Sequence, residues 1–354
     1  MKEDDATVPW ITWFGDDFTG SAAVMEVLAF AGVPSVLFTQ IPDAELLQRF
    51  AGCQAIGIAS TARSHSPAWM EEHLEAPLRF LDGLGAPLLH YKVCSTFDSA
   101  PEVGSIGAVT QALIDRFSPD VVAVIGGQPS LGRHCAFGTL FARGPDGETH
   151  RIDRHPIMSR HPGTPMREAD LRRHLAAQRL DGLALISVSD LRTPEDVSKT
   201  LRAGPALIDA THADDLPRID EALRLAGGRQ LLVGASSVAE ILGAGTHREP
   251  SNAVLPPASN NILLFAGSRS QTTATQVAEA SSYAKLALTP EALRSGALIP
   301  PARELLSAGT PTLVHLLPEA DYGLSPDALA DRVWTVIQDN GYGEWDGIIS
   351  LMTR

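Results

Sequence analysis

The sequence predicts an α/β protein of two domains: an N-terminal doubly wound parallel sheet and a smaller, apparently incomplete C-terminal α/β domain. Short apolar runs alternate with amphipathic stretches along most of the chain. Polar corners follow several of these runs, where a strand gives way to a helix. A stretch rich in Pro, Ser and Asn, 247–261, lacks periodicity and indicates a linker between domains 1–246 and 262–354. A length of 354 residues suits two such domains.

The first predicted strand and helix frame the most informative corner. Residues 11–14 form an apolar run typical of a buried parallel strand, and 21–31 carry apolar side chains at helical spacing. Asp16 and Asp17 lie between them, where ligands bind in open α/β sheets. Because side chains alternate along a strand, we expect one carboxylate to face a ligand and the other to cap backbone N–H groups. Alternatively, both serve only as caps and turn formers.

The same alternation continues to residue 126. Strands are predicted at 35–38, 54–60, 87–93 and 121–126, and helices at 44–50, 67–84 and 110–117. The pattern breaks down over 127–165. Within it, 151–165 is rich in Pro and is expected to form an ordered loop or lid with exposed histidines. A zinc site at His155 and His161 is the alternative, but no carboxylate or Cys keeps metal spacing with them.

Regular alternation then resumes and completes both domains. The first domain gains helices at 168–177, 194–203 and 214–226, and strands at 183–187, 206–210 and 230–233. In the second domain, strands are predicted at 262–266 and 312–316, with helices up to about 280 and over 326–337.

Composition limits the classes of partner. The formal net charge of -14 disfavours nucleic acid and anionic membranes, although local basic groups can still bind an anionic substrate. Cys53, Cys94 and Cys135 are isolated, which indicates neither a disulfide framework nor a zinc site. The acidic N-terminus lacks a signal sequence, and no apolar run approaches the roughly 20 residues of a membrane span. We therefore expect a cytoplasmic protein.

Polar side chains recur where predicted strands end. Arg63 follows the third strand, and Lys92, Ser95 and Thr96 follow the fourth. Together with the aspartates after the first strand, they would surround a small molecule at one sheet edge. Arg63 can hold a carboxylate through two parallel N–H bonds, whereas Lys92 acts as a compact point charge. The alternative for both cations is a solvated surface position.

The remaining groups favour phosphoryl transfer to a polyol. The hydroxyls of Ser95 and Thr96 suit a polyol, and an aspartate at the first corner could accept the proton of a hydroxyl that attacks phosphorus. Gly132 and Arg133 follow the fifth strand. Cys94 is more typical of a small core residue than of a nucleophile, because no His stands in an activating position.

The second domain carries one weak phosphate signal. Gly267 permits close backbone approach, and Ser268 can cap the following helix, whose N-terminus attracts phosphate. The chain contains no P-loop motif G-x-x-x-x-G-K-[ST], which excludes that class of nucleotide site. It also contains no G-x-G-x-x-G, which weakens a dinucleotide interpretation.

Taken together, these stretches resemble the four-carbon acid sugar kinase family over roughly residues 10–340. The matching motifs are Gly15-Asp16-Asp17-Phe18-Thr19-Gly20-Ser21, Tyr91-Lys92-Val93-Cys94-Ser95-Thr96, Gly132-Arg133, Ile208-Asp209-Ala210 and Gly267-Ser268-Arg269-Ser270 with Gln276. The resemblance implies an ATP- and Mg²⁺-dependent kinase of sugar acids, with transfer in a cleft between a substrate domain and a nucleotide domain. A homodimer is also expected.

The resemblance assigns roles by position. Asp16 and Asp17 would be catalytic. The residues that would bind the acid are Asp17, Arg63, Lys92, Val93, Cys94, Ser95, Thr96 and Arg133. ATP would be contacted by Gly267, Ser268 and Ser270.

Two departures from the family pattern bear on function. The usual Asp-Ser-Thr-Leu-Arg-Gly is here Cys94-Ser95-Thr96-Phe97-Asp98-Ser99, which looks like the branch that includes 3-oxo-isoapionate kinases. The family's later Gly-Gly-Asp-Thr loop and Gly-rich turn are replaced by 339–346 and a short tail. Because phosphoryl transfer depends on positioning and charge neutralisation, their loss predicts a truncated or degenerate kinase, or a partner that supplies them.

The sequence leaves four functions open, which fit it to different degrees. The leading hypothesis is a kinase acting on a four-carbon acid sugar, such as a threonate or erythronate, or on 3-oxo-isoapionate. The main alternative is a catalytically impaired relative that only binds a sugar acid. A phosphatase with an aspartyl nucleophile fits less well, because its signature spaces two aspartates by one residue whereas Asp16 and Asp17 are adjacent. A dehydrogenase lacks its glycine fingerprint.

Overall fold

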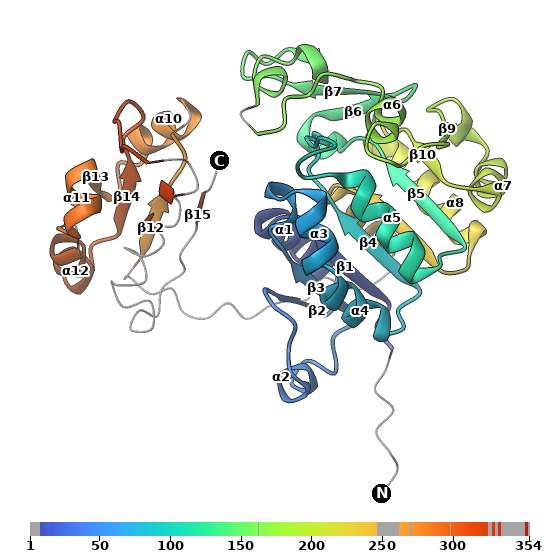
Figure 1. Ribbon diagram of the computed structural model, residues 1–354, viewed down its shortest axis with the longest axis horizontal. Helices are drawn as coiled ribbons and strands as arrows, with labels where there is room; N and C mark the ends of the chain where they lie inside the picture. Colours follow the sequence, from blue (N-terminus) through green and yellow to red (C-terminus); the bar gives the residue numbers. More distant parts are fainter. Residues whose placement is uncertain are drawn as a thin grey trace, which may run out of the picture. The chain divides into compact units, whose positions relative to one another are not determined.

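The computed structural model describes residues 8–161, 163–245, 262–269, 271–297, 299–324, 328–329, 332–333 and 351–352. The chain divides into two compact units, residues 1–252 and 253–354, and each contains a parallel sheet with helices (Figure 1). The predicted α/β class is therefore confirmed. The predicted linker 247–261 lies outside the described residues.

The first unit is built on an eight-stranded sheet in the order β2-β3-β1-β4-β11-β5-β10-β9, in which every pairing is parallel. Its strands are β1 (Ile11–Gly15), β2 (Ser35–Phe38), β3 (Ala55–Ala59), β4 (Leu88–Lys92), β5 (Val121–Ile125), β9 (Ala184–Ile186), β10 (Ala206–Ile208) and β11 (Gln230–Gly234). Because β1 lies between β3 and β4, the carboxyl ends of these three strands meet at one edge. That edge receives the predicted polar corners.

Helices cover both faces of this sheet, as a doubly wound fold requires (Figure 1). One face is covered by α1 (Phe18–Phe30), α7 (Pro194–Ala203), α8 (Leu216–Ala226) and α9 (Ser237–Ala244). The other is covered by α3 (Pro67–His73), α4 (Glu75–Gly83), α5 (Ile106–Phe117) and α6 (Leu171–Ala176), with the short α2 (Ala44–Gln48) beside them. Adjacent residues such as Trp13 and Phe14 belong to opposite cores. Two-sided burial explains why the strands are continuous apolar runs.

The single helix predicted at 67–84 is wrong in one respect, because it is broken at Leu74 into α3 and α4. Pro77 lies in the first turn of α4, where it lacks an N–H donor and its ring would clash with the carbonyl four residues earlier. Helix α5 begins four residues before its predicted start, because the Ser105 side chain accepts from Ala108 N at 3.3 Å and caps it.

The region 127–165 contains a three-stranded antiparallel sheet that the sequence analysis did not predict: β6 (Arg133–Ala136), β7 (Thr139–Arg143) and β8 (Thr149–Arg151). The turn between β6 and β7 places Phe137 and Gly138 at φ 53° and 76°. Both backbone N–H groups donate to the Asp209 carboxylate, at 2.5 and 3.0 Å. A carboxylate about 70 residues away in the sequence thus supports a turn that Phe disfavours locally.

The loop 151–165 contains two short 3₁₀ turns, Ile152–Arg154 and Met158–Arg160. The expectation of exposed histidines is wrong for His155, which is buried and accepts from Ile157 N and Met158 N at 3.2 Å each. His161 accepts from Thr164 N at 3.1 Å. Within the described residues, no group of three or more His, Cys, Asp or Glu could hold a metal ion.

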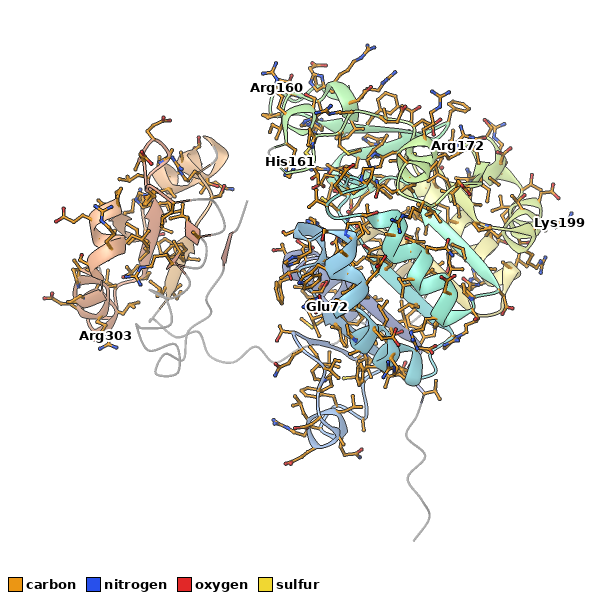
Figure 2. All side chains as sticks on the ribbon, in the orientation of Figure 1. Glu72, Arg160, His161, Arg172, Lys199 and Arg303 are labelled. Atoms are coloured by element: carbon orange, nitrogen blue, oxygen red, sulfur yellow. The ribbon has the colours of Figure 1, made fainter. Side chains whose placement is uncertain are left out.

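Charged side chains such as Arg160 and Lys199 project from the outside of the unit (Figure 2).

The second unit has a four-stranded parallel sheet in the order β13-β14-β12-β15. Its elements are β12 (Leu263–Ala266), α10 (Gln271–Glu279), β13 (Ala284–Leu288), α11 (Pro290–Ser295), α12 (Ile299–Ser307), β14 (Thr312–Leu316) and β15 (Leu351–Met352). The strands predicted at 262–266 and 312–316 are confirmed, whereas β13, α11 and α12 were not predicted. Of the predicted helix 326–337, only 328–329 and 332–333 are described, and both pairs are helical. Across the described residues, no helix is long and apolar enough to cross a membrane.

The packing of β1 against β3 predicts a strong effect at Gly57. A Cβ there would lie 2.0 Å from Cε2 of the fully buried Trp13 ring. We expect Gly57→Ala to lower the free energy of unfolding by about 1–3 kcal/mol, measured by urea denaturation. The matched control is Gly83→Ala in α4, where a Cβ meets nothing within 4 Å. It should leave stability unchanged or raise it by about 0.4–1 kcal/mol. Equal effects at the two sites would contradict this packing.

A buried histidine on β4 predicts a pH dependence of stability. His90 is fully buried, its Nε2 lies 3.1 Å from Gly234 O, and its Nδ1 has no partner in the described structure. Burial lowers the pKa of His90 to about 3. Below the unfolded-state pKa of about 6.5, the unfolded chain binds a proton that the folded chain excludes, so stability falls as the pH falls.

We expect this group to remove about 2 kcal/mol between pH 6.5 and 5. Denaturation of the wild type and of His90→Gln across this range measures the contribution, because glutamine can still donate to Gly234 O but does not titrate. An identical slope for the two proteins would show that His90 does not contribute.

Candidate functional site

The site begins where β1 passes into α1. Helix α1 approaches the strand so closely that a Cβ on Gly15 would lie 1.7 Å from Ser21 Oγ, so only glycine fits. Asp17 is the N-cap of α1, in extended conformation, and its Oδ1 accepts from Gly20 N at 3.0 Å. The corner predicted from the sequence is therefore a strand end joined directly to a capped helix.

Asp16 does not cap the helix and instead pairs with Arg63. Arg63 Nη2 donates to Asp16 Oδ1 at 2.7 Å, and Nε donates to Oδ2 at 3.1 Å. Nη2 also donates to Asp17 Oδ1 at 3.0 Å. The backbone aligns the pair, because Arg63 N donates to Asp16 O at 3.1 Å. Arg63 was predicted to form two parallel N–H bonds with a substrate carboxylate. In the structure it forms them with Asp16.

Burial sets the electrostatics of this pair. It raises the pKa of Asp16, and the charges on Arg63 and Lys92 act in the opposite direction. Burial alone would lower the pKa of Arg63, but the Asp16 carboxylate raises it above its ordinary value, so the guanidinium stays charged. The charge on Arg63 therefore opposes the effect of burial and favours the ionised form of Asp16.

Lys92 completes a cluster of four charges, which we call the ion cluster: Asp16, Asp17, Arg63 and Lys92. Lys92 is buried and its Nζ donates to Val93 O at 2.6 Å. A Cβ on Gly20 would lie 2.4 Å from both Lys92 Nζ and Asp17 Oδ1, so these two atoms flank Gly20. Arg63 and Lys92 therefore do not point into bulk water, and the surface alternative for them is wrong.

The two aspartates differ in exposure. The Asp17 side chain is 28% exposed and that of Asp16 only 3%. Asp17 Oδ2 has no hydrogen-bond partner among the described residues, whereas both oxygens of Asp16 are bonded to Arg63. The expected division into one capping and one ligand-facing carboxylate is not what the structure shows. Asp17 caps α1 through one oxygen and leaves the other accessible.

The loop after β4 carries further predicted residues. Val93 is buried and its N–H donates to Gly234 O at 2.9 Å, while Cys94 and Ser95 are half-buried. Thr96 is buried, and its Oγ1 lies 3.0 Å from Cys94 Sγ and 2.5 Å from Asp98 Oδ1. The predicted residues 92–96 thus continue from the ion cluster along one loop.

Buried hydrogen bonds to His174 and Gln178 stabilise the loop after β4. Phe97 adopts a left-handed φ of 53°, and its carbonyl oxygen lies 3.0 Å from His174 Nε2. Ser99 Oγ lies 2.9 Å from the same nitrogen, and Gln178 Nε2 donates to Ser99 Oγ at 2.9 Å. Sequence reasoning missed His174 and Gln178 as supports, because helix α6 and the loop after it meet this loop only in the tertiary structure. The one sequence signal that this loop differs from the usual family pattern was Asp98, which stands where that pattern has an arginine.

Other predicted residues lie apart from the ion cluster. Arg133 begins β6, its Nη1 donates to Leu131 O, and none of its hydrogen bonds within the described chain reaches the ion cluster. Gly267 and Ser268 follow β12 in the second unit, just before α10, and Ser270 lies outside the described residues. The intervening Arg269 donates to Pro318 O and Ala320 O, which ties this turn to the loop after β14.

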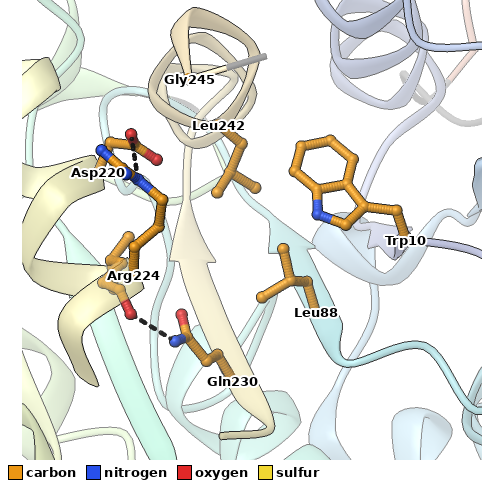
Figure 3. A pocket seen from close by; sticks show the side chains of 8 residues that line it. Trp10, Leu88, Asp220, Arg224, Gln230, Leu242 and Gly245 are labelled. Atoms are coloured by element: carbon orange, nitrogen blue, oxygen red, sulfur yellow. Dashed lines mark hydrogen bonds and ion pairs between the residues drawn. The ribbon is translucent and has the colours of Figure 1, made fainter. Parts of the chain in front are cut away.

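A pocket of about 330 Å³ lies at the opposite, amino-terminal edge of the large sheet (Figure 3). Trp10, Leu88 and Leu242 supply apolar walls, and Arg224 pairs with Asp220 at 2.9 Å. Leu88 is the first residue of β4, whereas Lys92 is the last. This pocket contains none of the predicted site residues.

Comparisons with known proteins place the chain in a family. The family model described as "Sugar-binding N-terminal domain" matches residues 11–242. A 3-oxo-isoapionate kinase of Paraburkholderia graminis is 39% identical over 330 residues, which cover 86% of this chain and 69% of that protein. The chain belongs to the four-carbon acid sugar kinase family.

Two further members of this family illustrate the range of similarity. A 3-oxo-tetronate kinase of Methylobacterium radiotolerans is 31% identical and covers 79% of this chain and 67% of its own length. The chain thus spans about two thirds of these two curated kinases. The solved structure of Haemophilus influenzae protein HI1011, of family DUF1537, has a TM-score of 0.67 at 23% identity and covers 93% of this chain and 81% of its own. That last likeness shows the shared fold.

Proposed function

We propose that this protein is an ATP-dependent kinase that phosphorylates a hydroxyl of a small sugar acid. The substrate would be a four-carbon acid sugar, such as threonate or erythronate, or a 3-oxo acid such as 3-oxo-isoapionate. The observation that carries the proposal is the ion cluster, because it presents an accessible Asp17 oxygen beside the buried Lys92 and the partly exposed Arg63 at the carboxyl edge of a parallel sheet. The named kinases among the relatives support the same reaction class.

In this proposal Asp17 accepts the proton of the attacking substrate hydroxyl through Oδ2. Its N-cap bond to Gly20 and its contact with Arg63 fix its position through Oδ1. Asp16 orients Arg63 rather than touching the substrate. Lys92, as a compact point charge, and the remaining N–H donors of Arg63 attract the acid end of the substrate. Ser95, half-buried, offers a hydroxyl to the polyol.

ATP would be contacted by Gly267, Ser268 and Ser270 at the start of α10. Mg²⁺ would accompany the nucleotide, since magnesium in such enzymes is held mainly by phosphates and by one or two carboxylates. No protein ligand is assigned to it. The predicted changes at 339–346 lie outside the described residues, so the loss of the family's later loops stays a prediction. The homodimer and the cytoplasmic location also stay predictions, the first of which light scattering would test.

A coupled ADP-release assay tests the function. With saturating ATP and Mg²⁺, we expect turnover with at least one of threonate, erythronate, 3-oxo-tetronate and 3-oxo-isoapionate. No ADP release with any of them would refute the kinase. If sugar acids then raised the melting temperature and ATP did not, the chain would be a sugar-acid-binding protein instead.

A further inference from the structure

The pocket at the amino-terminal edge of the large sheet lies apart from the ion cluster, and the proposed function does not use it (Figure 3). Its apolar walls are Trp10, which precedes β1, Leu88 of β4, Leu223 of α8 and Leu242 of α9. Leu223 and Leu242 are buried, and Trp10 and Leu88 are half-buried. The volume of about 330 Å³ is at the lower end of the range for small-molecule sites, which suits a molecule with a single ring.

A buried amide in this pocket has one end without a partner. Gln230 is 4% exposed, and its Nε2 donates to Leu223 O at 2.8 Å and to Gly227 O at 3.1 Å. Both partners are carbonyl oxygens, so turning the amide round would set oxygen against oxygen. Its Oε1 accepts from no described residue, and Figure 3 shows it on the pocket side of the amide. Because a buried polar atom without a partner costs free energy, Gln230 favours a ligand that donates a hydrogen bond.

A carboxylate on α8 offers a second acceptor. Asp220 is 5% exposed, and its Oδ2 pairs with Arg224 Nε at 2.9 Å. Its Oδ1 has no hydrogen-bond partner within the described part of the chain. Since the charges of Asp220 and Arg224 cancel, this side of the pocket favours an uncharged donor over an anion or a cation.

Trp10 supplies the complementary group. It lies across the pocket from Asp220 and Gln230 (Figure 3). Its indole Nε1, which can only donate, has no hydrogen-bond partner among the residues that the structure describes. The pocket therefore presents two acceptors, Gln230 Oε1 and Asp220 Oδ1, and one donor between apolar walls.

We propose that this pocket binds a small uncharged molecule that carries a primary carboxamide on an apolar ring. The two N–H groups of a carboxamide match the two acceptors, and its carbonyl oxygen matches the N–H of Trp10. The ring lies among the leucine side chains, which removes its apolar surface from water. This binding site goes beyond the proposed function, because none of its residues belongs to the ion cluster.

Titration of the full chain with benzamide, followed by saturation-transfer NMR of the ligand, tests the site. We expect a dissociation constant on the order of 1 mM, which is typical of a ligand this small. Benzoate and N,N-dimethylbenzamide keep the ring but lack N–H donors. Both should bind at least about tenfold more weakly, because they leave Gln230 and Asp220 unpaired. If the dimethyl compound binds as tightly as benzamide, the proposal is overturned.

Two variants locate the binding. Leu88→Trp fills the pocket from one wall and should abolish the binding of benzamide. Trp10→Phe keeps an apolar wall but removes the indole donor, and it should weaken binding by about three- to tenfold. The matched control, Trp69→Phe on α3, should bind benzamide as the wild type does. Asp17→Asn should also keep the wild-type affinity, which separates this pocket from the ion cluster.

The inference is wrong if the wild type does not bind benzamide, or if either folded variant, Leu88→Trp or Trp10→Phe, binds it with undiminished affinity. If Leu88→Trp does not fold, Trp10→Phe and the dimethyl compound still decide. None of these results depends on ADP release, so the kinase proposal stands or falls separately.

Discussion

Asp17→Asn is expected to lower kcat for sugar-acid phosphorylation by about 10²–10⁴-fold, the range typical of a lost general base. Asparagine is as good an N-cap as aspartate, so its carbonyl oxygen can still accept from Gly20 N and α1 keeps its start. The substitution therefore removes the proton acceptor at Oδ2 while preserving the local fold. The coupled ADP-release assay at saturating ATP and sugar acid gives kcat directly.

The control for this variant is Asp43→Asn. Asp43 caps α2 in the same way, with its Oδ1 accepting from Leu46 N at 2.8 Å, but it lies on the exposed surface. The control should keep the wild-type kcat, and both variants should keep the wild-type circular dichroism. A kcat for Asp17→Asn within fivefold of the wild type would remove Asp17 from the chemistry.

Arg63→Met is expected to lower the free energy of unfolding by about 3–5 kcal/mol, because it leaves the Asp16 carboxylate buried without its partner. Chemical denaturation of the full chain, followed by fluorescence, measures the change. The deficit should shrink as the pH is lowered. With Arg63 gone, the folded-state pKa of Asp16 lies further above its unfolded value, and a raised carboxyl pKa favours folding at low pH and opposes it as the pH rises.

Two comparisons define this result. Arg79→Met is the same substitution in an exposed pair, Arg79 with Glu75, and should leave the free energy of unfolding nearly unchanged. Asp16→Leu combined with Arg63→Met removes both charges and should recover much of the lost stability, which a double-mutant cycle quantifies. Equal losses for Arg63→Met and Arg79→Met would mean that the Asp16 carboxylate does not depend on Arg63.

Much of the fold follows from local sequence patterns. The strands at β1, β4, β5 and β11 are apolar runs, and α7 was predicted with its observed bounds. The antiparallel strands β6 and β7 escaped prediction because their turn depends on Asp209, which is distant in the sequence. Strand β13 was missed because Ala and Lys alternate with Leu in it and leave a weak apolar signal. The prediction of one helix over 67–84 overlooked Pro77, which lies in the first turn of the second of two helices.

The four residues of the ion cluster were named from the sequence, but the way in which they pair was not. Asp16, Asp17, Arg63 and Lys92 could be named from the sequence because the carboxyl ends of parallel strands meet at one edge. Which of these residues pair with each other could not be predicted from the sequence. The pairing depends on the order of β3, β1 and β4 in the sheet and on how deeply each side chain is buried.

The sequence by itself determined the α/β class, the strand-to-helix corner and the residue types gathered there, because apolar periodicity and turn chemistry are local properties of the chain. Only the tertiary structure decided that Arg63 is bonded to Asp16, that Asp17 is the accessible carboxylate and that Asp98 accepts a hydrogen bond from Thr96. These pairings arise mainly from contacts between segments far apart in the sequence. Burial of a charge or a polar group without a hydrogen-bond partner costs free energy, so each buried group is paired in the fold.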